Sequence, residues 1–216
     1  MSYRGFYSED EAQRHAGKLR EAGYDVYVGG VPAYSTLGWF DDPLLSTFIR
    51  YTDAQLARLV FHELAHQLVY AKGDTTFNES FAVAVEEEGV KRWLESEGRA
   101  AELAAFHAAQ ARKRELAERV SQTRERLAAI YRMDLPRAAM LEHKRGEWQR
   151  LRASYPAIPA EANNAFLASI AVYTELVPAF ERLLAESGSL EAFYGRVKAL
   201  AASARSSRDP LLARRP

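Results

Sequence analysis

The chain has 216 residues, and 48% of them are hydrophobic, so one domain, or one domain with an added helical lobe, can bury a sizeable core. Its 29 basic and 29 acidic residues cancel, which argues against nucleic acid as the main partner because phosphate binding needs a net basic face. The absence of cysteine excludes disulfides, thiolate catalysis and Cys-ligated zinc. No apolar run is long enough to span a bilayer, so no membrane segment is predicted.

The N-terminal part of the chain predicts a helix, a strand and a loop. Ser8 to Glu11 has capping-box spacing and predicts a helix to about Glu21. Tyr24 to Val31 is rich in β-branched and aromatic residues and is the best candidate for a strand. Residues 33–43 contain several aromatic side chains and are expected to form an ordered loop.

The rest of the chain predicts helices. A second capping box at Thr52 to Gln55 starts a helix to about Ala71, and Lys72 to Asp74 reads as a turn. Further helices are expected from Thr76 or Phe77 to Glu97, over Glu102–Tyr131, from Pro136 to Arg152, over Glu161–Ser187 with a kink allowed at Pro178, and from Gly188 to Ala202.

The second predicted helix carries the chemistry of the chain. Residues 62–66 read H-E-x-x-H, and residues four apart lie one helical turn above each other, so His62 and His66 can reach one metal ion. Glu63 lies beside them, where it can take a proton from metal-bound water. This spacing predicts a zinc-dependent peptidase with one Zn²⁺ per chain. The alternative is a pair of surface histidines on an ordinary helix.

A zinc ion needs a third protein ligand, and Glu79 is the best candidate. The other histidines are His15, His107 and His143. Glu79 begins the next helix after a short turn, and an antiparallel helix pair would bring it back toward His66. The alternative is that Glu79 is a helix-start carboxylate stabilised by the helix dipole.

A further carboxylate, Glu86, is expected on the same face of this helix as Glu79, because the two lie at helical spacing. A carboxylate on an apolar face needs a partner. Three interpretations stay open: Glu86 orients a metal-bound imidazole, it binds a substrate ammonium group, or it belongs to a solvated charge run at residues 86–88.

Two other regions are expected to complete the site. Tyr173, a phenol expected to be buried near Asn163, is the candidate donor to the oxyanion of peptide hydrolysis. The alternative is that Tyr173 is a core tyrosine, and Tyr155 is the next candidate donor. The predicted strand could pair with an extended substrate. Gly30 of this strand and Tyr34, Ser35 and Trp39 of the following loop could then line the cleft. The alternative is that the aromatic side chains of the loop cap the core.

These features predict a mainly α fold of the α+β class, with a zincin-like helical core, a small β edge element and a long-helix C-terminal lobe. Residues 1–100 would form the metal-binding part and residues 101–202 the lobe that completes the cleft. Residues 203–216 would be a flexible tail.

The string FHELAHQLVYAKGDTTFNESFAVAVEEEG, with GGVPAYSTLGWFDDPLL before it and NNAFLASIAVYTELVPAF after it, resembles a bacterial family of predicted aminopeptidases, a gluzincin-like group. The resemblance implies zinc ligands at His62, His66 and Glu79 and a catalytic Glu63. It also implies that residues 34–39 and the site-lining side chains Asn163, Asn164 and Tyr173 belong to the cleft. Family members usually begin with a lipoprotein-type signal, so the resemblance implies a periplasm-facing lipoprotein if an N-terminal segment is missing.

Two functional hypotheses follow. The leading one is an aminopeptidase that releases N-terminal residues through a zinc-bound water activated by Glu63, with peptides as substrates and an acidic group such as Glu86, Asp41 or Asp42 holding the ammonium. Endopeptidase action is the variant expected if no such group faces the cleft. The second hypothesis is a non-catalytic helical binding or assembly protein whose metal site is structural.

Overall fold

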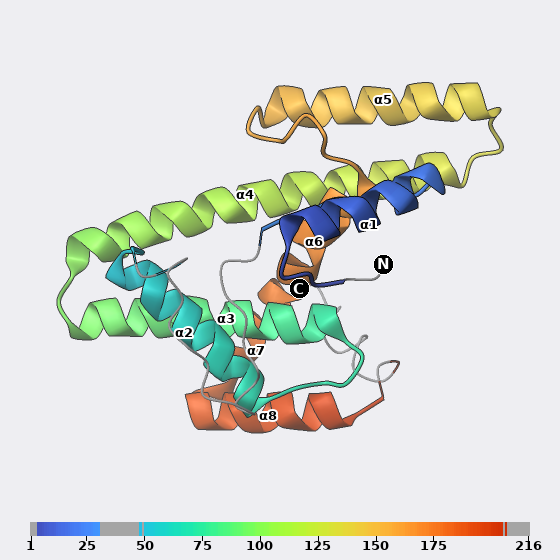
Figure 1. Cartoon of the computed structure of the whole chain (residues 1–216). Coiled ribbons are helices and arrows are strands. Elements are labelled where there is room, and N and C mark those ends of the chain that lie inside the picture. The colour runs from blue at the N-terminus through green and yellow to red at the C-terminus, as the bar shows by residue number, and fades with distance from the viewer. Residues whose placement is uncertain (1–3, 31–47, 49, 205, 207–216) are drawn as a thin grey trace. The chain divides into compact units, whose positions relative to one another are not determined.

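A computed structural model describes residues 4–30, 48, 50–204 and 206. The mainly helical fold predicted from the sequence is confirmed, because the described residues contain helices and no strand. The helices, labelled in Figure 1, are α1 (Glu9–Glu21), α2 (Asp53–Leu68), α3 (Thr75–Ser96), α4 (Ala100–Tyr131), α5 (Arg137–Ser154), α6 (Asn164–Thr174), α7 (Val177–Ser187) and α8 (Leu190–Ala202).

The predicted strand is wrong for the part that the structure describes, residues 24–30. A strand needs a neighbouring strand to pair its backbone groups, and no described residue provides one. The segment is held by side chains instead: Asn163 Nδ2 donates to the Val26 carbonyl at 2.9 Å, and Tyr27 packs edge-on against Phe166. The β-branched and aromatic composition therefore serves packing against a helix.

The chain divides into two compact units, each with its own core. One comprises Met1–Gly30 and Lys113–Ala171, and the other comprises Val31–Arg112 and Val172–Pro216. Helices α4 and α6 each contribute residues to both units. The domain boundary near residue 100 and the flexible tail expected from the sequence stay predictions, and most of that tail lies outside the described residues.

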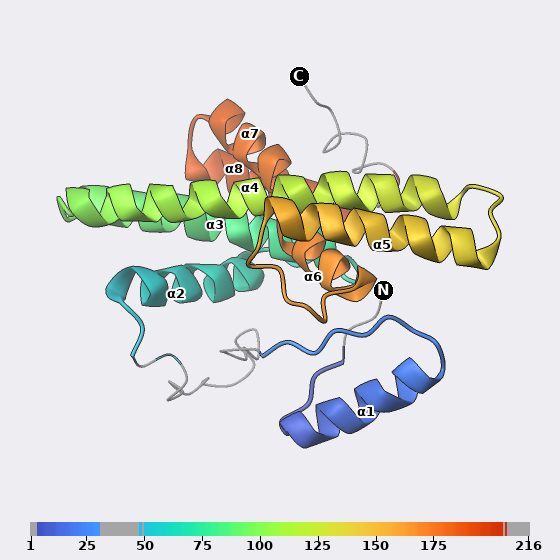
Figure 2. The same ribbon diagram turned by 90° about the horizontal axis from the view of Figure 1, so that it is seen from above.

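The unit that contains α1 and α5 is built around a helical hairpin. Helix α5 lies along the C-terminal half of α4 (Figure 2), and Arg126 Nε donates to Glu147 Oε2 at 2.6 Å between them. The α5–α6 connection and the first turn of α6 close this core, in which the largest buried side chains are Trp148 and Phe166.

The other unit holds the predicted metal-binding residues. Helix α3 is central to it: the buried aromatic side chains of α3 pack against α7 and α8, and the C-terminal end of α2 adds small and β-branched side chains to the same core. The aromatic members are Phe77, Phe81, Phe180 and Phe193. Helices α2 and α3 lie side by side in both views (Figures 1 and 2), and this pair positions the site described below.

Two helix boundaries differ from the prediction for local reasons. Helix α2 ends at Leu68 and not near Ala71, because Val69 takes up an extended conformation. The single helix expected over Glu161–Ser187 is two helices, α6 and α7, because Pro178 has no N–H to continue the hydrogen-bond ladder and clashes with the preceding turn.

Candidate metal centre

Helix α2 begins where its capping box predicts. The Thr52 hydroxyl accepts a hydrogen bond from the Gln55 N–H at 3.3 Å, and the Gln55 side chain accepts one from the Thr52 N–H at 3.0 Å. A helix that starts at Asp53 places His62 and His66 one turn apart on the same side. The rings lie edge to face with their centroids 4.9 Å apart.

Two side chains stabilise the turn between α2 and α3: that of Asp74, the residue before α3, and that of Asn78 in its first turn. Asn78 accepts from the Ala71 N–H at 2.7 Å and donates to the Ala71 carbonyl at 2.9 Å, so one buried amide satisfies both backbone groups. Asp74 caps α3 by accepting from the Phe77 N–H at 3.1 Å. Because Glu79 follows Asn78 directly, this clamp fixes where the Glu79 side chain starts.

The result is a compact group of three potential metal ligands, His62, His66 and Glu79, whose ligand atoms all lie within 4.8 Å of one another. The two imidazole Nε2 atoms are 3.3 Å apart. Glu79 Oε2 lies 3.3 Å from Nε2 of His62 and 3.8 Å from Nε2 of His66. The group could hold a metal ion, and its three members come from two neighbouring helices.

The spacing of these atoms fits a tetrahedral zinc site. Ligand atoms at about 2.0–2.1 Å from a tetrahedral zinc ion lie roughly 3.3 Å from one another, and two of the three separations here are 3.3 Å. The chemistry also fits, because the neutral His62 ring that donates Nδ1–H to the Glu86 carboxylate keeps a lone pair on Nε2 for a metal ion. In the protonated ring Nε2–H donates to Glu79 instead, so a cation bound between these two atoms would take the place of that proton.

Glu86 is buried behind the ligand group, as its place on the α3 face predicts; its side chain is 2% exposed. Its Oε2 accepts from His62 Nδ1 at 2.8 Å, and its Oε1 accepts from Arg58 Nε at 2.5 Å. The interpretation as a solvated charge run is therefore wrong for Glu86. It applies to Glu88, whose oxygens pair with Lys91 and Arg92 at the surface.

The two histidines have opposite pKa shifts in the protein without an ion. Burial disfavours the His62 imidazolium, but hydrogen bonds and charge from Glu79 and Glu86 outweigh burial and raise the pKa of His62 to about 9. Burial lowers the pKa of His66, and the positive charge of His62 acts in the same direction against the carboxylates. His66 Nδ1 is buried and has no hydrogen-bond partner among the described residues.

Glu63 and Tyr173 are the predicted catalytic side chains. Glu63 lies on α2 directly after His62 and is partly buried. The Tyr173 ring centroid lies 6.4 Å from that of His62. The expectation that Tyr173 is buried is wrong, because it is 43% exposed in the last turn of α6.

Ser80 ties the end of α6 to α3 beside Glu79. Its hydroxyl donates to the Val172 carbonyl at 3.2 Å and accepts from the Leu176 N–H at 3.3 Å. These bonds satisfy backbone groups at the break between α6 and α7. Ser80 therefore fixes the segment that carries Tyr173 against the helix that carries Glu79.

The remaining predicted cleft residues belong to the other unit or lie outside the described residues. Gly30 and Asn164 belong to the other unit, as does Asn163, which caps α6 by accepting from the Ala165 N–H at 2.9 Å. Asn164 exchanges hydrogen bonds with the Tyr131 hydroxyl there. Their role as lining residues stays a prediction. The aromatic-loop residues Tyr34, Ser35 and Trp39, and the acidic pair Asp41 and Asp42, lie outside the described residues.

Sequence reasoning missed Arg58, Asn78 and Ser80, although all three hold parts of the site. Arg58 precedes His62 by four residues and so shares its helix face, which is a usable signal. Asn78 and Ser80 flank Glu79 and are polar residues between the apolar side chains Phe77 and Phe81. A buried polar side chain in such a position needs a backbone partner.

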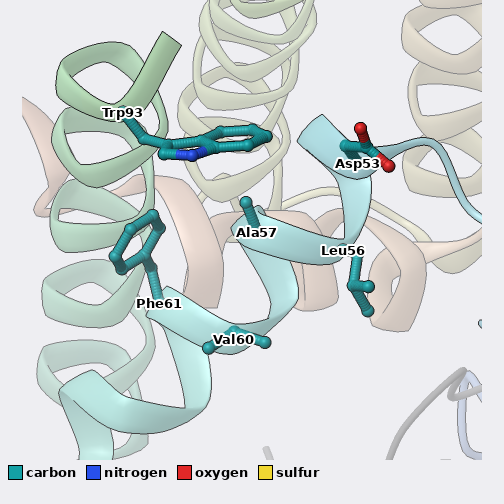
Figure 3. A pocket seen from close by; sticks show the side chains of 6 residues that line it. All are labelled: Asp53, Leu56, Ala57, Val60, Phe61 and Trp93. Atoms are coloured by element: carbon teal, nitrogen blue, oxygen red, sulfur yellow. The ribbon is translucent and has the colours of Figure 1, made fainter. Parts of the chain in front are cut away.

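A pocket is present on the N-terminal half of α2, but it is separate from the ligand group. Figure 3 shows Trp93 of α3 lying over Ala57, with Phe61 directed toward α3. The pocket is mainly apolar, and none of the three potential ligands lines it; its residues are Asp53, Leu56, Ala57, Val60, Phe61 and Trp93.

Comparison with known protein families shows to which family the chain belongs. A family model described as "Putative aminopeptidase" matches residues 1–212. The chain belongs to this family. No curated protein and no solved structure matches it. Membership in the putative aminopeptidase family indicates a peptidase, and therefore peptides as the class of substrate. In the described residues of this family member, no helix combines the length and the apolar character needed to cross a membrane.

Proposed function

We propose that the protein is a zinc-dependent peptidase of the gluzincin type that acts as an aminopeptidase. The observation that carries the proposal is the convergence of His62 Nε2, His66 Nε2 and Glu79 Oε2 within 4.8 Å. The H-E-x-x-H spacing and membership in the putative aminopeptidase family support it. Among the described residues the group has three members, the number that catalytic zinc sites use.

The zinc ion, when bound, would polarise the substrate carbonyl and lower the pKa of water. Glu63 takes the proton of the attacking water and passes it to the leaving amine. Its place directly after His62 on α2, outside the group of three potential ligands, supports this role. Tyr173, half-exposed and next to His62, donates its hydroxyl proton in a hydrogen bond to the oxyanion.

Glu86 serves in this proposal as an orienting carboxylate and not as the group that binds a substrate ammonium. Both of its oxygens are engaged, one by His62 and the other by Arg58. A carboxylate this deeply buried is out of reach of a substrate amine. Aminopeptidase action in this proposal therefore rests on the family membership.

The proposal is tested by measuring zinc content together with peptide cleavage, using matched peptides with free and blocked N-termini. Wild type should carry about one zinc per chain, as a three-ligand site requires, and should cleave the free peptides. Glu63→Gln should keep zinc and lose turnover, and His66→Ala should lose zinc. His107→Ala, at an exposed position on α4, is the control and should behave like wild type.

The results separate the alternatives. Equal zinc in wild type and His66→Ala would show that the ligand assignment is wrong. Cleavage of blocked and free peptides alike would indicate an endopeptidase. Zinc binding without cleavage of any peptide would favour the second hypothesis, a helical binding protein with a structural metal site.

A further inference from the structure

Arg58 lies one turn before His62 on the face of α2 that meets α3. Its Nε donates to Glu86 Oε1 at 2.5 Å, while His62 Nδ1 donates to the other oxygen of the same carboxylate at 2.8 Å. The Glu86 side chain is 2% exposed, whereas that of Arg58 is 42% exposed. One buried carboxylate of α3 is thus shared by a surface cation and a potential metal ligand.

Each partner contributes something different to Glu86. A buried carboxylate with one hydrogen bond is poorly compensated and can still turn about its side-chain bonds. A second donor on the other oxygen supplies positive charge and fixes the plane of the carboxylate. With Oε1 held by Arg58, Oε2 stays directed at His62 Nδ1. The imidazole is then kept with Nδ1 protonated and Nε2 turned toward His66 and Glu79.

We propose that Arg58 is a positioning residue of the metal centre, acting through Glu86 to set the ring orientation and tautomer of His62. The inference rests on the proposed function only in that the group binds a divalent metal. It is independent of which peptide bond is cleaved. Orienting partners of ligand histidines typically account for about 10–100-fold in metal affinity. His66 Nδ1 has no such partner among the described residues, so the orienting contact on His62 carries particular weight.

The test is a thermodynamic cycle of zinc affinity, measured with a competing chelator on wild type, Arg58→Met, Glu86→Gln and the double variant. Arg58→Met keeps much of the side-chain volume and should weaken zinc binding about ten-fold. If Arg58 acts through Glu86, adding Arg58→Met to Glu86→Gln should cost less than about two-fold more. Arg92→Met is the matched control, because it removes an Arg–Glu pair of α3 with Nε 2.6 Å from Glu88, and its zinc affinity should equal that of wild type.

Two further measurements separate positioning from general destabilisation. In the cobalt-substituted protein, Arg58→Met should shift the visible absorption bands, because the ligand field depends on the orientation of His62. Arg92→Met should leave these bands unchanged. Arg58→Lys keeps a positive charge near Glu86 but loses the planar fork, so it should bind zinc within about three-fold of wild type. If Arg58→Met does not fold, Arg58→Gln replaces it, because it also removes the positive charge and should weaken zinc binding about ten-fold.

Several outcomes would overturn the role of Arg58. The first is that Arg58→Met has the zinc affinity and the cobalt spectrum of wild type. The second is that Arg58→Met lowers zinc affinity by the same factor in wild type and in Glu86→Gln. The third is that Arg58→Lys binds zinc no better than Arg58→Met. Failure of the proposed function looks different, because wild type would then bind zinc but cleave no peptide, and the comparisons of metal affinity among variants would still decide the role of Arg58. If wild type binds no divalent metal, both proposals are wrong.

Discussion

Gly89 sets how closely α2 can approach α3, and replacing it with alanine should disturb the metal centre from a distance. A Cβ at this position would lie 2.8 Å from Phe61 Cγ and 2.9 Å from Phe61 Cδ2. Ordinary carbon contacts are about 3.5–4.0 Å, so the ring must recede by roughly half an ångström or more. Phe61 directly precedes His62, and a shift of α2 would therefore move His62 away from Glu79.

The size of the effect follows from two opposing contributions. Overpacking costs about 1–3 kcal/mol, while exchanging glycine for alanine inside a helix returns up to about 1 kcal/mol. The net loss should be about 1–2 kcal/mol, which corresponds to a fall of about 3–6 °C in the unfolding temperature for a chain of this size. Zinc affinity should fall about ten-fold, because metal centres tolerate displacements of only about 0.5 Å.

The assay combines thermal unfolding of the metal-free protein with chelator competition for zinc. Gly195→Ala is the matched control: Gly195 lies in α8, and a Cβ there would meet nothing within 4 Å, so this variant should be slightly more stable and bind zinc normally. Phe61→Leu in the Gly89→Ala background removes the clashing ring and should recover part of both losses. Stability at or above that of wild type together with normal zinc affinity in Gly89→Ala would refute the reasoning.

Three other predictions follow from the same geometry. In metal-free protein the unfolding temperature should fall as the pH rises from 6.5 to 9, because the pKa of His62 is raised to about 9 in the folded state. About 3 kcal/mol of stability, fully present below pH 6.5, is lost as His62 deprotonates. An unfolding temperature that does not change across this window would contradict the prediction. Asn78→Ala should lower the free energy of unfolding in urea by about 1–3 kcal/mol, because it leaves the buried N–H of Ala71 unpaired, whereas the Ala71 carbonyl still accepts from the Asp74 N–H at 3.2 Å. A loss below the size of one hydrogen bond would argue against the clamp. Tyr173→Phe should lower kcat about 100-fold with unchanged zinc content and KM, whereas Tyr155→Phe, in the other unit, should not; equal activities would remove Tyr173 from the mechanism.

The local chemistry of the site could be predicted from the sequence because it depends on helical spacing. Two histidines four residues apart on a capped helix must share a face. The short turn after α2 brings Glu79 back to them, and the helical period places Glu86 on the inner side of α3. Each of these inferences needs only backbone geometry over a few turns.

Features that depend on contacts between distant segments could not be predicted in the same way. Residues 24–30 have the composition of a strand, but pairing requires a second strand, which no local pattern reveals. The exposure of Tyr173 depends on the break between α6 and α7, where Ser80 of α3 supplies the hydrogen bonds that let the chain turn. Arg58 was missed because a lone arginine on a helix is usually solvated, and only the buried position of Glu86 gives it a role.

The Asn78 clamp and the ligand group lie within the continuous stretch formed by α2 and α3, whereas Tyr173 follows much later in the chain. A chain emerging from the ribosome therefore has every member of the ligand group, together with Arg58 and Glu86, before α4 to α8 have been synthesised. If the protein is the proposed zinc peptidase, metal capture could therefore precede the ability to complete the reaction during biosynthesis. The group that would hold the ion precedes the hydroxyl that would stabilise the oxyanion.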